Sequence, residues 1–256
     1  MSGYVYAGIA GFLAGIVVNY FSDVLPQERG LTRPICANCS VPFSWMEYFF
    51  LKKCYGCRQN RNFRAYLILI SSIIFSILIW LFPPVRLGYW LGLLVLAYFG
   101  LVIVIDMENH LIFHIVNLAG ALIGLIVGTI RYNLLTALFG GIAGFLIMLL
   151  LFGFGILFSR YRVRKLGFDD GEESLGFGDV FLAGVLGFML GWPLIIYGLT
   201  IGIFFGGFNS LALIAYLLAR HHYEKMNLFT AYGPYLVIGA AILIYFPQSL
   251  TFLSSL

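Results

Sequence analysis

Long apolar runs separated by short polar segments dominate the chain. A helix needs about 20 residues to cross the hydrocarbon core of a bilayer, and eight runs reach or approach that length. We place them at residues 4–22, 66–82, 88–105, 111–130, 134–158, 177–191, 194–219 and 229–247. The pattern predicts an all-α polytopic membrane protein with about eight transmembrane helices.

The composition agrees with this class of protein. Hydrophobic residues make up 61% of the 256 residues and charged residues only 10%, against about 45–50% and about 25% in soluble domains. The net charge of +4 does not indicate a nucleic-acid partner, because Lys and Arg in membrane proteins mainly report orientation. The first run has span length and no basic residue ahead of it, which favours a retained helix over a cleaved signal peptide, the alternative.

The basic residues predict the orientation of the spans. With eight spans, the polar segments 23–65, 159–175 and 220–228 fall on one side of the membrane, and they carry every Lys and Arg except Arg86 and Arg131. The positive-inside rule makes that side cytoplasmic. We therefore expect a plasma (inner) membrane protein with both termini outside.

Three segments follow from this pattern. We expect a first transmembrane helix at 1–22, a cytoplasmic insert at 23–65 and a seven-helix membrane bundle at 66–256. The charged segment 159–175 is predicted to be a flexible loop that could gate a site near residue 179. The bundle also contains small residues that allow close helix packing: Gly140, Gly141, Ala143 and Gly144.

All four cysteines lie in the insert, in two C-x2-C pairs separated by fourteen residues: Cys36, Cys39, Cys54 and Cys57. Two such pairs are typical of a structural zinc site with four thiolate ligands and no open position for chemistry. Disulfides are rare in the reducing cytoplasm. An insert of this size has little core of its own, so a metal would hold it together. One C-x2-C alone would also suit a redox pair.

Two carboxylates stand at the edges of apolar runs. Asp106 ends one run and Asp179 opens another, framed by Gly176 and Gly178. On the predicted topology both lie at the cytoplasmic membrane face at similar depth. Asp179 could simply cap a helix and Asp106 could mark a helix end. The glycines favour a functional site at Asp179, since they permit unusual dihedral angles and close backbone approach. Most other carboxylates, Asp23 among them, are expected to be solvated.

Two nearby Asp side chains suit peptide hydrolysis. They share a proton, so one activates water while the other donates to the carbonyl of the peptide bond. A metal site is the alternative for Asp106, His110 and His114, which recur every four residues along what could be one helical face. No H-E-x-x-H motif is present, and we interpret these histidines as interfacial side chains or partners of the carboxylates. The pair His221–His222 is expected to be solvated.

The motifs together resemble the type IV prepilin peptidases, a family of membrane aspartyl proteases with a G-x-G-D motif. That motif is Gly176-Phe177-Gly178-Asp179 here. The other matching segments occur in the family's order: "GFLAGIVVNYFSDVLP" (11–26), the double C-x2-C insert, "VIDMENHLIFHIVN" (104–117), "GFGDVFLAG" (176–184) and "AYGPYLVIGA" (231–240).

The resemblance implies a function and its residues. Such enzymes remove the basic leader of prepilins or pseudopilins at the cytoplasmic face, and many then N-methylate the new N-terminus with S-adenosylmethionine. It implies Asp106 and Asp179 as the catalytic residues and the four cysteines as zinc ligands. The chain departs from many members at Phe181, where they have Lys, and lacks a Glu that follows their second C-x2-C. The alternatives are a proton-coupled transporter that uses Asp106 and Asp179, and a non-cleaving assembly scaffold.

Overall fold

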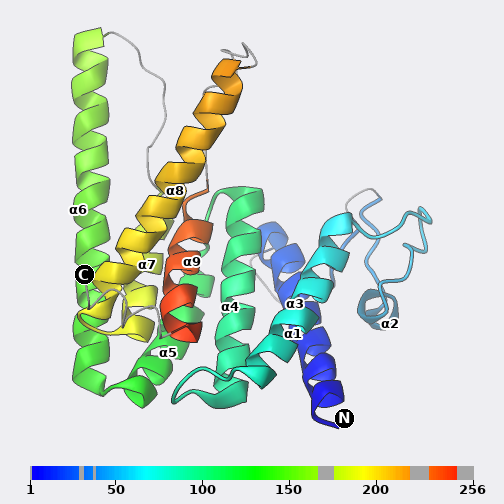
Figure 1. The fold of residues 1–256 in the computed structure, drawn as a ribbon. Coiled ribbons are helices and arrows are strands. Elements are labelled where there is room, and N and C mark those ends of the chain that lie inside the picture. Colours follow the sequence, from blue (N-terminus) through cyan, green and yellow to red (C-terminus); the bar gives the residue numbers. More distant parts are fainter. Residues whose placement is uncertain (1, 29–31, 37–38, 167–175, 220–230, 247–256) are drawn as a thin grey trace. The chain divides into compact units, whose positions relative to one another are not determined.

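The computed structural model describes residues 2–28, 32–36, 39–166, 176–219 and 231–246 (Figure 1). Apart from one isolated bridge between Ile35 and Pro42, the regular structure in these ranges is helical. The helices are α1 (Ser2–Glu28), α2 (Trp45–Phe49), α3 (Phe63–Leu81), α4 (Gly88–Asn109), α5 (His114–Arg131), α6 (Leu134–Leu166), α7 (Phe177–Leu190), α8 (Leu194–Ala219) and α9 (Gly233–Tyr245). The chain forms two compact units, Met1–Ile105 and Asp106–Leu256.

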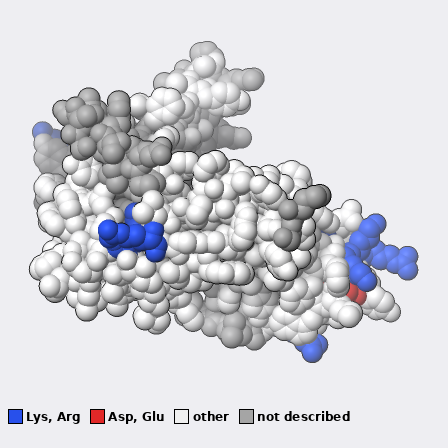
Figure 2. Space-filling model, turned by 60° about the horizontal axis from the view of Figure 1, so that its bottom comes forward, with Lys and Arg blue, Asp and Glu red and all other residues white. Residues whose placement is uncertain are grey.

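Each of the eight predicted apolar runs overlaps one helix, so the predicted all-α membrane fold is confirmed. Six of these helices are long and apolar enough to cross a membrane: α1, α3, α4, α5, α6 and α8. Helices α7 and α9 are shorter, at 14 and 13 residues. Figure 2 shows one face of the molecule, on which few side chains are charged. The short helix α2, inside the insert, was not predicted.

In the first unit, α1 and α3 pack closely and are joined by buried polar bonds. A Cβ atom added at Gly11 would lie 2.6 Å from the Cβ of Ser76, so a small residue is needed there. The Ser76 hydroxyl donates to the Ala7 carbonyl (2.7 Å), and the Asn19 amide donates to the Ala65 carbonyl (3.1 Å). Such bonds fix one helix against another in apolar surroundings, where hydrophobic contact alone gives little preference.

The insert has a small core and an ion-pair network at Asp23. The Tyr48 hydroxyl donates to the Asp23 carboxylate (2.6 Å), and Arg61 (3.0 Å) and Arg64 form ion pairs with it. Burial, and then the nearby Asp23 charge, raise the pKa of Tyr48, which keeps the hydroxyl protonated as a donor. The expectation that Asp23 is simply solvated was therefore wrong. Its partners lie 25 to 41 residues further along the chain, where no local pattern reveals them.

Helix α7 lies at the centre of the second unit (Figure 1), in contact with α5, α6, α8 and α9. Ten of its residues are buried: Asp179, Val180, Leu182, Ala183, Gly184, Val185, Leu186, Gly187, Met189 and Leu190. At about 1.5 Å per residue, α7 is only about 21 Å long, less than the roughly 30 Å of a hydrocarbon core. A short helix is tolerated here because its ends meet protein.

A buried arginine lies where α7 and α9 end. The Arg131 guanidinium, on the last residue of α5, donates to the carbonyls of Met189 (3.5 Å) and Leu243 (3.4 Å). The last carbonyls of a helix have no partner within the helix, and a cation at that end also interacts favourably with the helix dipole. Arg131 thus stabilises the far ends of the two helices whose N-terminal ends form the candidate site.

Helix α6 continues to Leu166, so the basic half of the segment 159–175 is helical. The prediction of a flexible loop was wrong for residues 159–166. The helix extends beyond the apolar run, because Arg, Lys and Leu are good helix formers whether or not lipid surrounds them. Residues 167–175 lie outside the described residues, and so do His221 and His222.

Candidate active site

Asp106 is a buried carboxylate in the last turn of α4, with 4% of its surface exposed. A negative charge at a helix C-terminus opposes the helix dipole, so the position does not stabilise α4. The compensating partner comes from another helix. The backbone N–H of Gly233, the first residue of α9, donates to Asp106 Oδ2 (2.9 Å). This arrangement argues against a simple helix-end marker at Asp106.

Asp179 is the other buried carboxylate, 7% exposed, in the first turn of α7. Its Oδ2 accepts from the N–H of Gly176 (3.3 Å), so the carboxylate does contribute to the start of the helix. Gly176 has an ordinary extended conformation, with φ −78° and ψ 141°, so the conformational freedom of glycine is not used there. Close approach does occur at Gly178, where an added Cβ would lie 3.2 Å from Ile112 Cβ.

The fold brings the two carboxylates into one site. Both belong to the second unit. Ile112, in the connection between α4 and α5, contacts the backbone at Gly178 and at Gly233. It therefore packs between the segments that hold Asp179 and Asp106. Two buried carboxylates near one another favour the state in which they share a proton.

The histidines do not form a metal site with Asp106. Helix α4 ends at Asn109, His110 has a positive φ of 51°, and α5 begins at His114. The three side chains therefore do not lie on one helical face. His114 instead packs edge-on against Phe181, with ring centroids 5.7 Å apart. Within the described ranges, the four cysteines are the one group of His, Cys, Asp and Glu side chains that could hold a metal ion.

One residue of this site carried no assigned role in the sequence. Gly233 supplies the N–H that binds Asp106. The available signal was the segment "AYGPY", since a Pro in the first turn marks a helix start and the N–H groups there attract anions. What the sequence did not show is which carboxylate this helix start would meet.

The four cysteine sulfur atoms form a compact cluster in the insert. The sulfur atoms lie within 4.8 Å of one another, with 3.7 Å between those of Cys36 and Cys57 and 3.5 Å between those of Cys39 and Cys54. A tetrahedral site with Zn–S bonds of about 2.3 Å would place its sulfur atoms about 3.8 Å apart. Phe43 and Tyr48 pack against the cluster. The four cysteines could hold a metal ion.

Comparison with known proteins agrees with the motifs. A family model described as the type IV leader peptidase family matches residues 93–211, a range that includes Asp106 and Asp179. A prepilin leader peptidase/N-methyltransferase of Aeromonas salmonicida is 27% identical over 91% of this chain and 80% of its own length. One from Aeromonas hydrophila is 27% identical over 90% of this chain and 77% of its own length. No solved structure shows a significant match.

The long apolar helices make this a membrane protein, and the matched family and the curated relatives support a protease. The predicted resemblance to the type IV prepilin peptidases is confirmed. The transporter and scaffold interpretations are not favoured, because the matched family and the relatives are named as peptidases.

Proposed function

We propose that the protein is an aspartyl endopeptidase that removes the leader peptide of type IV prepilins or pseudopilins. The observation that carries this proposal is the pair of buried carboxylates, Asp106 and Asp179, within the matched family segment, with Ile112 packed between the backbone segments at Gly178 and Gly233. The orientation that follows from the basic residues puts this pair at the cytoplasmic face of the inner membrane, where the basic leader would lie.

The chemistry requires one shared proton. The ionised carboxylate takes a proton from water, and the water oxygen attacks the carbonyl carbon of the scissile peptide bond. The protonated carboxyl donates to the carbonyl oxygen, which carries the developing negative charge. The C–N bond then breaks, the amine leaves with a proton, and a carboxylate and a free N-terminus remain. In this proposal Gly176 and Gly178 support the site by letting the backbone approach closely.

Cleavage of a prepilin from the same cell is the direct test. The purified protein, reconstituted in lipid nanodiscs, is expected to shorten a prepilin at the end of its leader, as measured by mass spectrometry. The same spectrum reports N-methylation, which adds about 14 Da per methyl group to the mature chain and requires S-adenosylmethionine. A folded protein that leaves every prepilin of its cell uncut would contradict the proposed function.

We further propose that the insert 23–65 is a zinc-binding domain and that the bundle 66–256 carries the reaction. Zinc bound by Cys36, Cys39, Cys54 and Cys57 would be structural, because four thiolates leave no open position. Arg61, which lies over the Phe43 and Tyr48 rings at 4.9 Å and 4.3 Å, would help to offset the negative charge of the four thiolates.

Zinc content provides a test of the insert. Elemental analysis is expected to find about one zinc per chain in the wild type and much less in Cys54→Ser, because three thiolates hold the metal less tightly. Limited proteolysis should then cut the insert of the variant faster. The control is Tyr55→Phe, at the neighbouring residue, which is 85% exposed. Stoichiometric zinc that survives in Cys54→Ser would rule out the four-cysteine site.

A further inference from the structure

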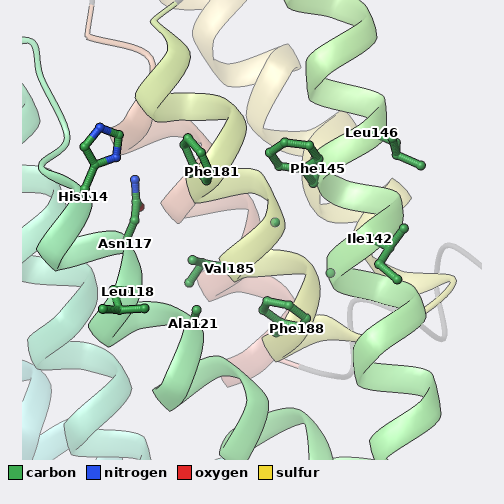
Figure 3. Close-up of a pocket in the computed structure, with 12 residues that line it drawn as sticks. His114, Asn117, Leu118, Ala121, Ile142, Phe145, Leu146, Phe181, Val185 and Phe188 are labelled. Atoms are coloured by element: carbon green, nitrogen blue, oxygen red, sulfur yellow. The ribbon is translucent and has the colours of Figure 1, made fainter.

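A groove of about 540 Å³ runs along α7 in the second unit (Figure 3). Its floor is one face of α7, made by Phe181, Gly184, Val185 and Phe188. These positions follow the i, i+3, i+4, i+7 spacing of a single helical face, about two turns or 10 Å long. Helices α5 and α6 form the walls. The volume is in the range of small-molecule sites, roughly 300–1,000 Å³, so several apolar side chains would fit.

The groove has a polar end. On α5, the lining positions His114, Asn117, Leu118 and Ala121 again follow one helical face, with the two polar residues at the N-terminal end. Figure 3 shows His114 and Asn117 beside Phe181, and Ala121 further along, near Val185 and Phe188. The remaining lining side chains are apolar. A ligand for this groove is therefore apolar along most of its length and polar at one end.

The side chain of Asn117 provides a buried hydrogen-bond acceptor at that end. Its side chain is only 5% exposed, and its amide nitrogen donates to the Gly178 carbonyl (3.5 Å). Its amide oxygen is buried and has no hydrogen-bond partner among the described residues. A buried acceptor without a donor is destabilising, so this oxygen is suited to an N–H group that a ligand brings.

The polar end of the groove lies at the same end of α7 as Asp179. Gly178, which Asn117 contacts, is adjacent to Asp179, and Phe181 follows two residues later on the same helix. Positions 179 and 181 lie about 200° apart around α7, so a chain cut at Asp179 would pass over the first turn of α7 to enter the groove. The first N–H groups of any helix have no partner within that helix. A helix that begins at the polar end would present such donors to the Asn117 oxygen.

We propose that this groove binds the apolar helical segment that follows the scissile bond of the substrate, with Asn117 Oδ1 accepting a peptide N–H at the start of that helix. The inference rests on the proposed peptidase function and identifies its substrate-binding surface. Helix-in-groove recognition uses anchors at i, i+3, i+4 and i+7 of the bound helix. A lipid acyl chain would fill the apolar part but has no N–H for Asn117.

The kinetic test compares two substitutions on α5. Ala121→Phe fills the groove, whereas Ala119→Phe adds the same ring at an exposed position that does not line it. With a prepilin substrate, Ala121→Phe is expected to raise KM about tenfold while kcat changes little, since it removes binding and leaves the chemistry intact. Ala119→Phe should change neither. Equal KM values for the two variants and the wild type would overturn the proposal.

A photo-crosslinking test does not depend on cleavage. Phe188→p-benzoylphenylalanine places the photoreactive group in the groove, and Phe139→p-benzoylphenylalanine places it at an exposed position of α6 outside it. In the Asp179→Asn background, residue 188 is expected to crosslink to the apolar segment of an uncut prepilin, and residue 139 is not. Crosslinks to lipid alone from both positions would assign the groove to acyl chains and overturn the proposal.

The two tests separate the groove from the proposed function. If the wild type cuts prepilin but residue 188 captures no substrate, the groove proposal fails and the peptidase function stands. If the wild type cuts no prepilin although residue 188 captures one, the groove proposal stands and the peptidase function fails.

Discussion

Asp106→Asn and Asp179→Asn are each expected to lower kcat/KM for leader cleavage by about 10³-fold or more. General acid–base catalysis typically contributes about 10²–10⁴-fold. In the proposed mechanism one carboxylate activates the water and the other donates to the carbonyl oxygen, so the loss of either should remove nearly all of this contribution. An amide has almost the same shape as a carboxyl but neither takes nor gives the required proton. Cleavage is measured by mass spectrometry with protein in nanodiscs.

Glu108→Gln is the matched control for these variants. Glu108 lies on α4 two residues from Asp106 but is exposed, so the same loss of a carboxylate should leave cleavage within about twofold of the wild type. Both Asn variants should keep the thermal unfolding temperature of the folded protein. If a folded Asn variant retains a tenth or more of the wild-type activity, that carboxylate is not catalytic.

Gly187→Ala is expected to destabilise the second unit strongly, although it adds a single methyl group. An added Cβ at Gly187 would lie 2.2 Å from the Gly140 carbonyl oxygen, and one at Gly140 would lie 2.4 Å from the Gly187 carbonyl oxygen. Backbone atoms cannot move aside as a flexible side chain can, so α6 and α7 must separate. Overpacking of this kind costs about 1–3 kcal/mol or more.

The measurement is the thermal unfolding temperature in detergent. Gly187→Ala should lower it by several degrees, at about 2–4 °C per kcal/mol for a chain of this size. The control is Gly153→Ala on α6, where an added Cβ meets nothing within 4 Å. That change should be neutral or stabilising, because Ala is the better helix former by about 1 kcal/mol. Equal stability of the two variants would show that α6 and α7 can separate at little cost.

The small residues of α6 show what a local sequence pattern can and cannot predict. Gly140, Gly141 and Gly144 indicated close helix packing, and the structure gives all three an α7 neighbour, with an added Cβ at Gly144 only 2.4 Å from the Ala183 carbonyl oxygen. Gly153, on the same helix, has no such neighbour. The sequence does not distinguish these glycines, because the difference depends on which residues of α7 lie opposite.

Local sequence patterns were sufficient to predict several features of this protein. Apolar runs of span length predict helices because a chain in lipid must pair its backbone polar groups internally. Each of the eight runs overlaps a helix. The C-x2-C spacing brings the cysteines of each pair together over a single turn, and all four sulfur atoms cluster. The positions of Asp106 and Asp179 at the edges of apolar runs marked the candidate site.

Only the tertiary structure decided which distant groups meet. It places the Gly233 N–H on Asp106 across 127 residues, gives Asp23 its Tyr and Arg partners, and surrounds the short helix α7 with protein. It also leaves the Asn117 oxygen buried beside an apolar groove. Helix formation depends on hydrogen bonds between residues four apart in sequence. These long-range contacts depend instead on how whole helices pack, and the sequence of a single apolar helix does little to specify its packing partners.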